Sequence, residues 1–126
     1  MAADISILAL TLAGIALAGF EASFAHGRTR FLQPGMWVPP AYLILALWLG
    51  GWYLAAPDSA LPRLGLYYLL WVGLAVGLTG EFFHLRRAKR LAASAPRGRY
   101  RALAAGPQLT LPLLFTLLSL FGLLAF

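Results

Sequence analysis

The 126-residue sequence contains no cysteine and very little charge. Without thiols the chain forms no disulfide, no thiolate metal site and no thiol redox centre. Charged residues make up 11% of the chain and hydrophobic residues 61%, whereas a soluble domain averages roughly 25% charged residues. The sequence also lacks a glycine-rich phosphate loop, a paired histidine motif and a serine–histidine–aspartate set. No common catalytic pattern is therefore present, and long apolar runs dominate.

Four apolar stretches account for most of the chain: residues 5–25, 37–56, 64–83 and 102–126. A hydrocarbon core about 30 Å thick requires roughly 20 helical residues to cross it. Each stretch has that length, and little is left over for a soluble domain. We therefore predict an all-α fold, an integral membrane four-helix bundle that forms one domain over residues 1–126.

The first stretch is predicted to be a retained helix rather than a cleaved signal peptide. The residues before it include Asp4 and contain no Lys or Arg, whereas signal peptides begin with a basic region. Asp4 is also placed to cap the start of this helix. Pro39 and Pro40 suit the first turn of the second helix, where a missing N–H costs little.

Basic residues occur almost entirely in the first and third gaps between the stretches, and only Arg63 lies in the second gap. Because basic residues are retained on the cytoplasmic side, we expect both termini on the other side and a basic cytoplasmic loop over residues 84–101. Leu and Ala interleave with the basic residues over 85–95, so the third helix is expected to continue past the membrane. The expected location is a prokaryotic cytoplasmic membrane.

The basic cluster after the third stretch also indicates partners. We expect it to contact anionic lipid headgroups, and the same charge would suit a phosphate-bearing substrate or an acidic protein. Nothing in the sequence resembles an element that reads bases, so nucleic acid is not an expected partner. The expected headgroup contacts are Arg86, Arg87, Lys89, Arg90, Arg97, Arg99 and Arg101.

Glu81 is the most informative single residue of the third stretch. Gly73 and Gly77 precede it at four-residue intervals on one helix face, with Gly80 and His84 beside them. The Gly-x-x-x-Gly spacing lets another helix approach closely, so we expect Glu81 to face protein rather than lipid. A charge at this depth costs about 2.5–3.5 kcal/mol and is usually paired or neutralised.

Glu21 occupies a similar place near the end of the first stretch. Gly14 and Ala18 belong to a row of small residues at four-residue intervals, and Glu21 is one step around the helix from Ala18. If the small faces of the first and third helices pack together, Glu21 and Glu81 lie at comparable depth.

These residues allow three kinds of chemistry. Glu81, with or without Glu21, could bind a proton or cation in a transporter. The pair Glu81 and His84, at i and i+3, resembles half of a helical di-iron motif, but a second such motif is missing. His26 or His84 could ligate a cofactor such as haem or chlorophyll, although the sequence identifies no cofactor.

An ordinary structural interpretation competes with each of these. Both glutamates lie about one turn from arginines, so they could reach the interface and pair with Arg28, Arg86 or Arg87. We favour that interpretation for Glu21 and leave both open for Glu81. His26 and His84 are better read as interfacial side chains than as ligands.

The leading functional hypothesis is a non-catalytic subunit, assembly factor or scaffold of a membrane complex, which associates with other membrane chains or with itself. The hypothesis follows from apolar spans whose ionisable groups gather at one interface. The alternative is a small oligomeric proton- or cation-coupled transporter that uses Glu81 and Glu21. A membrane enzyme with a metal at Glu81 and His84 is the third possibility.

Overall fold

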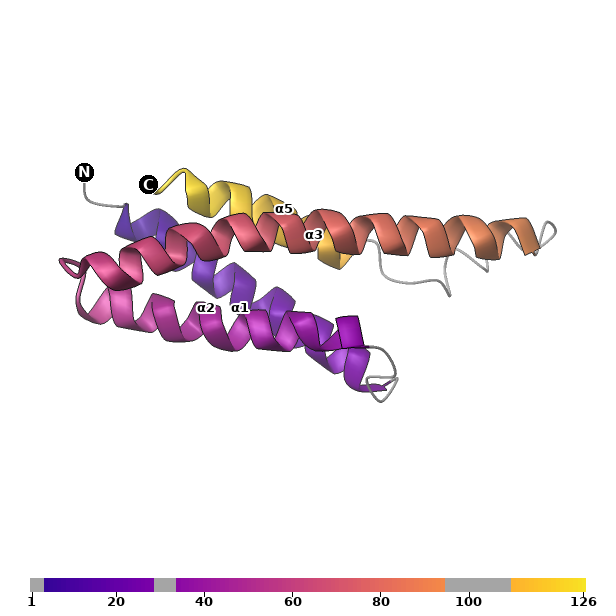
Figure 1. Ribbon diagram of the computed structural model, residues 1–126, viewed down its shortest axis with the longest axis horizontal. Coiled ribbons are helices and arrows are strands. Elements are labelled where there is room, and N and C mark those ends of the chain that lie inside the picture. The colour runs from indigo at the N-terminus through magenta and orange to yellow at the C-terminus, as the bar shows by residue number, and fades with distance from the viewer. Residues whose placement is uncertain (1–3, 29–33, 95–109) are drawn as a thin grey trace.

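The computed structural model describes residues 4–28, 34–94 and 110–126, and every regular element in these ranges is helical (Figure 1). The elements are α1 (Ile5–Arg28), the short 3-10 helix η1 (Pro34–Trp37), α2 (Val38–Ala55), α3 (Ala60–Ser94) and α5 (Thr110–Leu123). Three helices are long and apolar enough to cross a membrane: α1, α2 together with η1, and α3. Helix α5 is also apolar, but its described part has 14 residues.

Two local signals in the sequence act as predicted. The Asp4 Oδ1 atom accepts hydrogen bonds from the backbone N–H groups of Ser6 (2.9 Å) and Ile7 (3.2 Å). These bonds satisfy two of the donors that the first turn of a helix leaves free. Proline occupies the first turn of α2, where its fixed φ suits the helix.

The four helices form a ring in which each packs against two neighbours. Helix α1 packs against α2 and α5, and α3 packs against the same two helices, while the backbones of α1 and α3 make no contact. At one end of the ring, the backbone N–H of Asp4 donates to the carbonyl of Ala125 at 2.9 Å. Figure 1 shows this end beside the turn that joins α2 to α3.

The interior of the ring is filled mainly by apolar side chains in two adjoining clusters. One includes Ile15, Leu70 and Phe115 from three different helices, and the other lies nearer the α2–α3 turn around Leu8 and Tyr53. Since α1, α3 and α5 all contribute side chains, the ring is closed by side-chain packing as well as by backbone approach.

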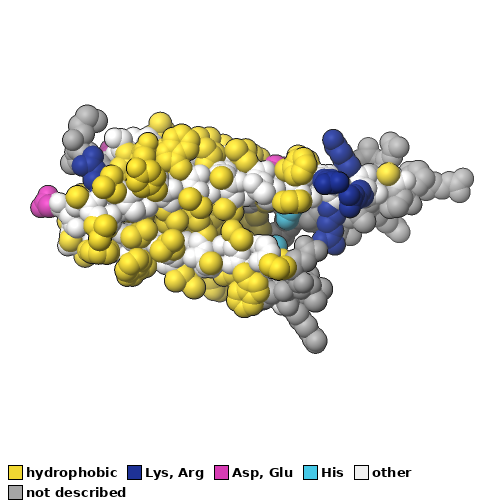
Figure 2. Space-filling view, in the orientation of Figure 1, with side chains coloured by type: hydrophobic (Ala, Val, Ile, Leu, Met, Phe, Trp, Pro, Cys, Tyr) yellow, Lys and Arg dark blue, Asp and Glu magenta, His cyan; other side chains and the backbone are white. Residues whose placement is uncertain are grey.

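The outer surface of the bundle is also apolar. Hydrophobic side chains cover much of the face of the bundle seen in Figure 2, and residues such as Leu17, Phe20 and Ile44 are 70–76% exposed. A soluble monomer rarely exposes contiguous apolar patches above a few hundred Å². Together with the three long apolar helices, this surface indicates a membrane protein.

Helix α3 corrects the predicted boundaries. It begins at Ala60 rather than at residue 64, and it continues to Ser94, so residues 84–94 are helical rather than part of a loop. The interleaved Leu and Ala residues predicted this continuation. At 35 residues the helix is about 52 Å long, roughly 20 Å more than a hydrocarbon core requires. Residues 95–101 of the predicted loop lie outside the described ranges.

Candidate functional site

Helix α3 carries the residue that the sequence marks most strongly. Glu81 is half buried, and its Oε2 atom is enclosed without a hydrogen-bond partner among the described residues. Within the same part of the chain, no ion pair joins Glu81 to Arg86 or Arg87. A polar atom enclosed without a partner is costly, so Glu81 is the ionisable side chain of the bundle that most needs an explanation.

The glycine face beside Glu81 packs against α5. A methyl group added at Gly77 would lie 2.8 Å from the backbone nitrogen of Thr116 and 2.9 Å from the carbonyl oxygen of Pro112. One added at Gly80 would lie 3.2 Å from the side chain of Pro112. The Thr116 hydroxyl donates to the Pro112 carbonyl at 3.1 Å. The two backbones therefore approach closely along this face.

Gly73 lies where three helices meet. The Tyr42 hydroxyl from α2 and the Ser119 hydroxyl from α5 both lie against it. The two hydroxyls are near enough to interact with each other, but neither has hydrogen-bond geometry with any described group. The ring of Tyr42 also packs edge-on against Phe115, with centroids 5.8 Å apart. Tyr42 was not among the candidates predicted from the sequence, where its signal is a phenol within an otherwise apolar span.

Helix α1 does not meet the glycine face of α3. Because α1 and α3 lie diagonally across the ring, their small faces do not pack together, and the condition for Glu21 and Glu81 to share a site is not met. Gly14 instead lies against the side chain of Leu118 on α5, and Ala18 is buried in the apolar core. Glu21 is exposed. The structure therefore gives no support to a site shared by Glu21 and Glu81.

His26 and His84 interact electrostatically across the bundle, although they come from different helices. Both imidazoles are partly buried, and Figure 2 shows the histidines at the end of the bundle near the basic residues. In the described ranges, no group of three His, Cys, Asp or Glu side chains is arranged to hold a metal ion. Among the described residues, the Glu81 and His84 pair is thus not extended into a metal site by a third ligand.

Basic side chains gather on the part of α3 that projects beyond the bundle (Figure 2). At the same end, the Arg28 guanidinium lies over the Phe24 ring, 5.0 Å from its centroid. Arg97, Arg99 and Arg101 fall outside the described residues. The four basic side chains of the projecting segment are all exposed: Arg86, Arg87, Lys89 and Arg90.

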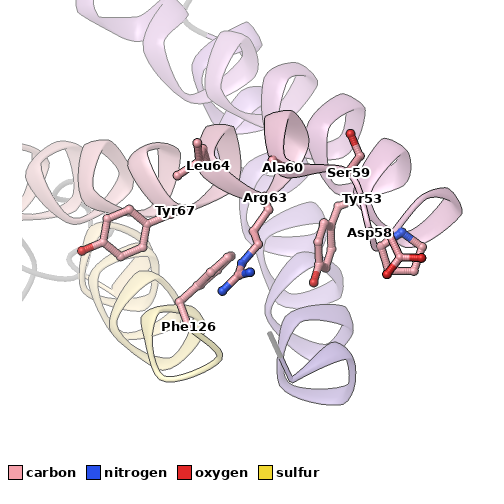
Figure 3. A pocket seen from close by; sticks show the side chains of 9 residues that line it. Tyr53, Asp58, Ser59, Ala60, Arg63, Leu64, Tyr67 and Phe126 are labelled. Atoms are coloured by element: carbon pink, nitrogen blue, oxygen red, sulfur yellow. The ribbon is translucent and has the colours of Figure 1, made fainter. Parts of the chain in front are cut away.

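The opposite end of the bundle has a cleft that the sequence did not reveal. Its volume is about 670 Å³, and it lies between the α2–α3 turn, the start of α3 and Phe126. Figure 3 shows the Arg63 side chain pointing into this space between Tyr53 and Phe126. In the sequence, the one signal for this cleft is the isolated position of Arg63 between the second and third apolar stretches.

Comparison with protein-family models, with curated proteins and with solved structures finds no match for this chain.

Proposed function

We propose that the protein is a non-catalytic component of a membrane assembly, in which the bundle anchors a basic helical segment that docks an acidic partner chain. We call residues 85–94 of α3 the basic arm. The observation that carries this proposal is the uninterrupted continuation of α3 to Ser94, well past the glycine face that packs on α5.

The basic arm has a defined charged face. At 3.6 residues per turn, its four basic side chains fall within about 160° of the helix circumference. Ala88 lies on the other side of the helix and is buried. A one-sided array of exposed cations attracts and orients a partner with complementary charge. Its continuation from a membrane-crossing helix holds that array at a fixed distance from the bundle.

The bundle interior supports a structural role for the rest of the chain. Three of its hydroxyl groups donate to carbonyls one turn earlier in the same helix: Thr11 to Ile7, Ser23 to Gly19 and Thr116 to Pro112. Such hydroxyls are occupied by the helix that carries them. With the apolar clusters around them, they form a packed support rather than a polar path.

The test is purification from native membranes in a mild detergent, followed by native mass spectrometry. We expect the chain to co-purify with partner chains in a fixed ratio. Replacing all four basic residues of the arm with Gln should release the partners, whereas a variant in which its three arginines become Lys should retain them, because its charge is unchanged. Isolation of the chain without any partner would contradict the proposal, as would full retention by the Gln variant.

A second function is favoured by a different observation, the enclosed and unpartnered Oε2 of Glu81. A carboxyl group in this position can bind a proton or a cation. The proposed role is proton or cation binding in a small oligomeric transporter, with Glu81 as its central residue.

This second function is tested by reconstitution into liposomes. We expect proton or cation flux from the parent protein, loss of flux in Glu81→Gln and retention of flux in Glu21→Gln, since Glu21 is exposed. Absence of flux in the parent, or equal flux in the parent and Glu81→Gln, removes the transporter hypothesis. Co-purification of partners bears on the first proposal only, so the two experiments separate the two functions.

A further inference from the structure

The cleft at the end of the bundle opposite the basic arm has the features of a binding site. It is formed by residues from three separate parts of the chain, namely the end of α2, the start of α3 and Phe126. Its volume of about 670 Å³ is large enough for a polar headgroup of a lipid or a small organic anion. It is independent of the basic arm and of Glu81, so it goes beyond both proposed functions.

Arg63 supplies a cation to this cleft. It is half buried, and its guanidinium points into the space (Figure 3). In the part of the chain that the structure describes, no carboxylate forms an ion pair with it, and Asp58 lines the same cleft as an exposed side chain. Guanidinium groups donate in a planar fork that matches phosphate and carboxylate oxygens. An anion is therefore the complementary ligand.

Tyr53 supplies a second donor. Its side chain is 1% exposed, and its hydroxyl points towards the same space as Arg63 (Figure 3). No hydrogen bond to this hydroxyl is present among the described residues. Because Tyr53 lines the cleft, its hydroxyl is available there to donate a hydrogen bond to a ligand.

The remaining walls of the cleft are apolar. The rings of Tyr67 and Phe126 pack edge-on with centroids 5.7 Å apart. Leu64 lines the cleft and is exposed on the outer surface, which is the surface that would face lipid. The site thus combines hydrogen-bond donors for an anion inside the cleft with an apolar exit towards the membrane. Tyr and Trp side chains are typical of this boundary region of a membrane protein.

We propose that this cleft binds the phosphate group of a phospholipid, with Arg63 donating through its guanidinium fork and Tyr53 through its hydroxyl. The acyl chains leave the cleft along Leu64. Phosphate in free solution offers the same oxygens but has no chains to use the apolar exit. The lipid is therefore the assigned ligand, and inorganic phosphate is the alternative source that the experiment separates.

The experiment is a lipid titration of the full chain in detergent, followed by native mass spectrometry with dioleoyl phosphatidylglycerol as the probe. We expect Arg63→Gln to weaken binding of the first lipid about tenfold, because a charge-assisted hydrogen bond is lost. Arg63→Lys and Tyr53→Phe should each weaken it about threefold, since each keeps part of the donor set. These two variants also test the site if Arg63→Gln does not fold.

Arg28→Gln is the matched control. It removes one positive charge at the other end of the bundle, where Arg28 stacks on Phe24, and should change affinity less than twofold. Dioleoylglycerol, which has the same chains without phosphate, should not bind, and millimolar inorganic phosphate should not displace the lipid. Equal effects of Arg63→Gln and Arg28→Gln would overturn the proposal. Equal binding of dioleoylglycerol, or displacement by inorganic phosphate, would overturn the assignment to a phospholipid.

Discussion

The small residues of α3 and those of α1 have similar spacing but different surroundings. On α3, Gly77 faces the backbone nitrogen of Thr116 and the carbonyl oxygen of Pro112, neither of which can rotate away. On α1, Gly14 faces the terminal methyl groups of Leu118, which a change of rotamer can move. Gly77 therefore sets the distance between two backbones, whereas Gly14 leaves room for a side chain that can adapt.

This difference shows what a row of small residues determines. Small residues permit close approach, but the partner helix decides whether the approaching surface is backbone or a flexible side chain. The comparison can be tested by adding volume at single glycines, with stability measured as the free energy of unfolding in mixed micelles of a mild detergent and sodium dodecyl sulfate.

The largest effect is expected for Gly77→Leu. Because backbone atoms of α5 occupy the space that the side chain needs, α3 and α5 must separate, and overpacking of this kind costs about 3 kcal/mol or more. We expect the free energy of unfolding to fall by that amount. Unchanged stability would show that α3 and α5 do not approach each other in the way described.

Gly73→Ala should have a smaller but clear effect. The added methyl group would lie 2.5 Å from the Ser119 Oγ atom and against the Tyr42 hydroxyl, both of which are buried side-chain atoms. These side chains can shift slightly, so we expect a loss of about 1–2 kcal/mol.

The control for Gly73→Ala is the same substitution combined with Ser119→Ala. Removing the Ser119 hydroxyl frees part of the space that the added methyl group needs. The double variant should therefore be more stable than the sum of the two single effects predicts, because substitutions at residues in contact are not additive. Strict additivity of the two substitutions would argue against the contact.

The helices themselves could be predicted from the sequence with few errors. The lengths of the first three apolar runs, the cap at Asp4 and the proline in the first turn of α2 are local signals, and the structure reproduces them. Within the fourth run the structure describes the helix Thr110–Leu123, and residues 102–109 lie outside the described ranges. The continuation of α3 to Ser94 also followed from local composition. Each of these depends on residues that are near one another in the chain.

The arrangement of the helices could not be predicted in the same way. Several helices carry small residues, and spacing alone does not say that the glycine face of α3 meets α5 rather than α1. The Arg63 cleft was missed for a related reason, because it is completed by Phe126, a residue distant in sequence. The contact between Tyr42 and Ser119 likewise joins two helices that are not neighbours in the chain.

Gly51→Ala should raise the free energy of unfolding slightly, in contrast to the losses expected for Gly77→Leu and Gly73→Ala. Gly51 lies within α2, is exposed, and has no atom within 4 Å of the position that a Cβ would take. Alanine favours the helix over glycine by up to about 1 kcal/mol, so we expect a gain of about 0.5 kcal/mol. A loss of stability would indicate that this face of α2 is covered by another helix or chain.

The smallest effect is expected for Gly14→Ala. The added methyl group would lie 2.5 Å from a terminal methyl of Leu118, so this half-buried side chain must change its rotamer at a cost of about 0.5–1.5 kcal/mol. The gain in helix propensity of about 1 kcal/mol offsets this cost, and the net change should be close to zero. If Gly14→Ala instead lowers the free energy of unfolding as much as Gly73→Ala does, the flexible Leu118 side chain resists an added methyl group as strongly as the buried Tyr42 and Ser119 hydroxyls do. The distinction drawn between the small faces of α1 and α3 would then be wrong.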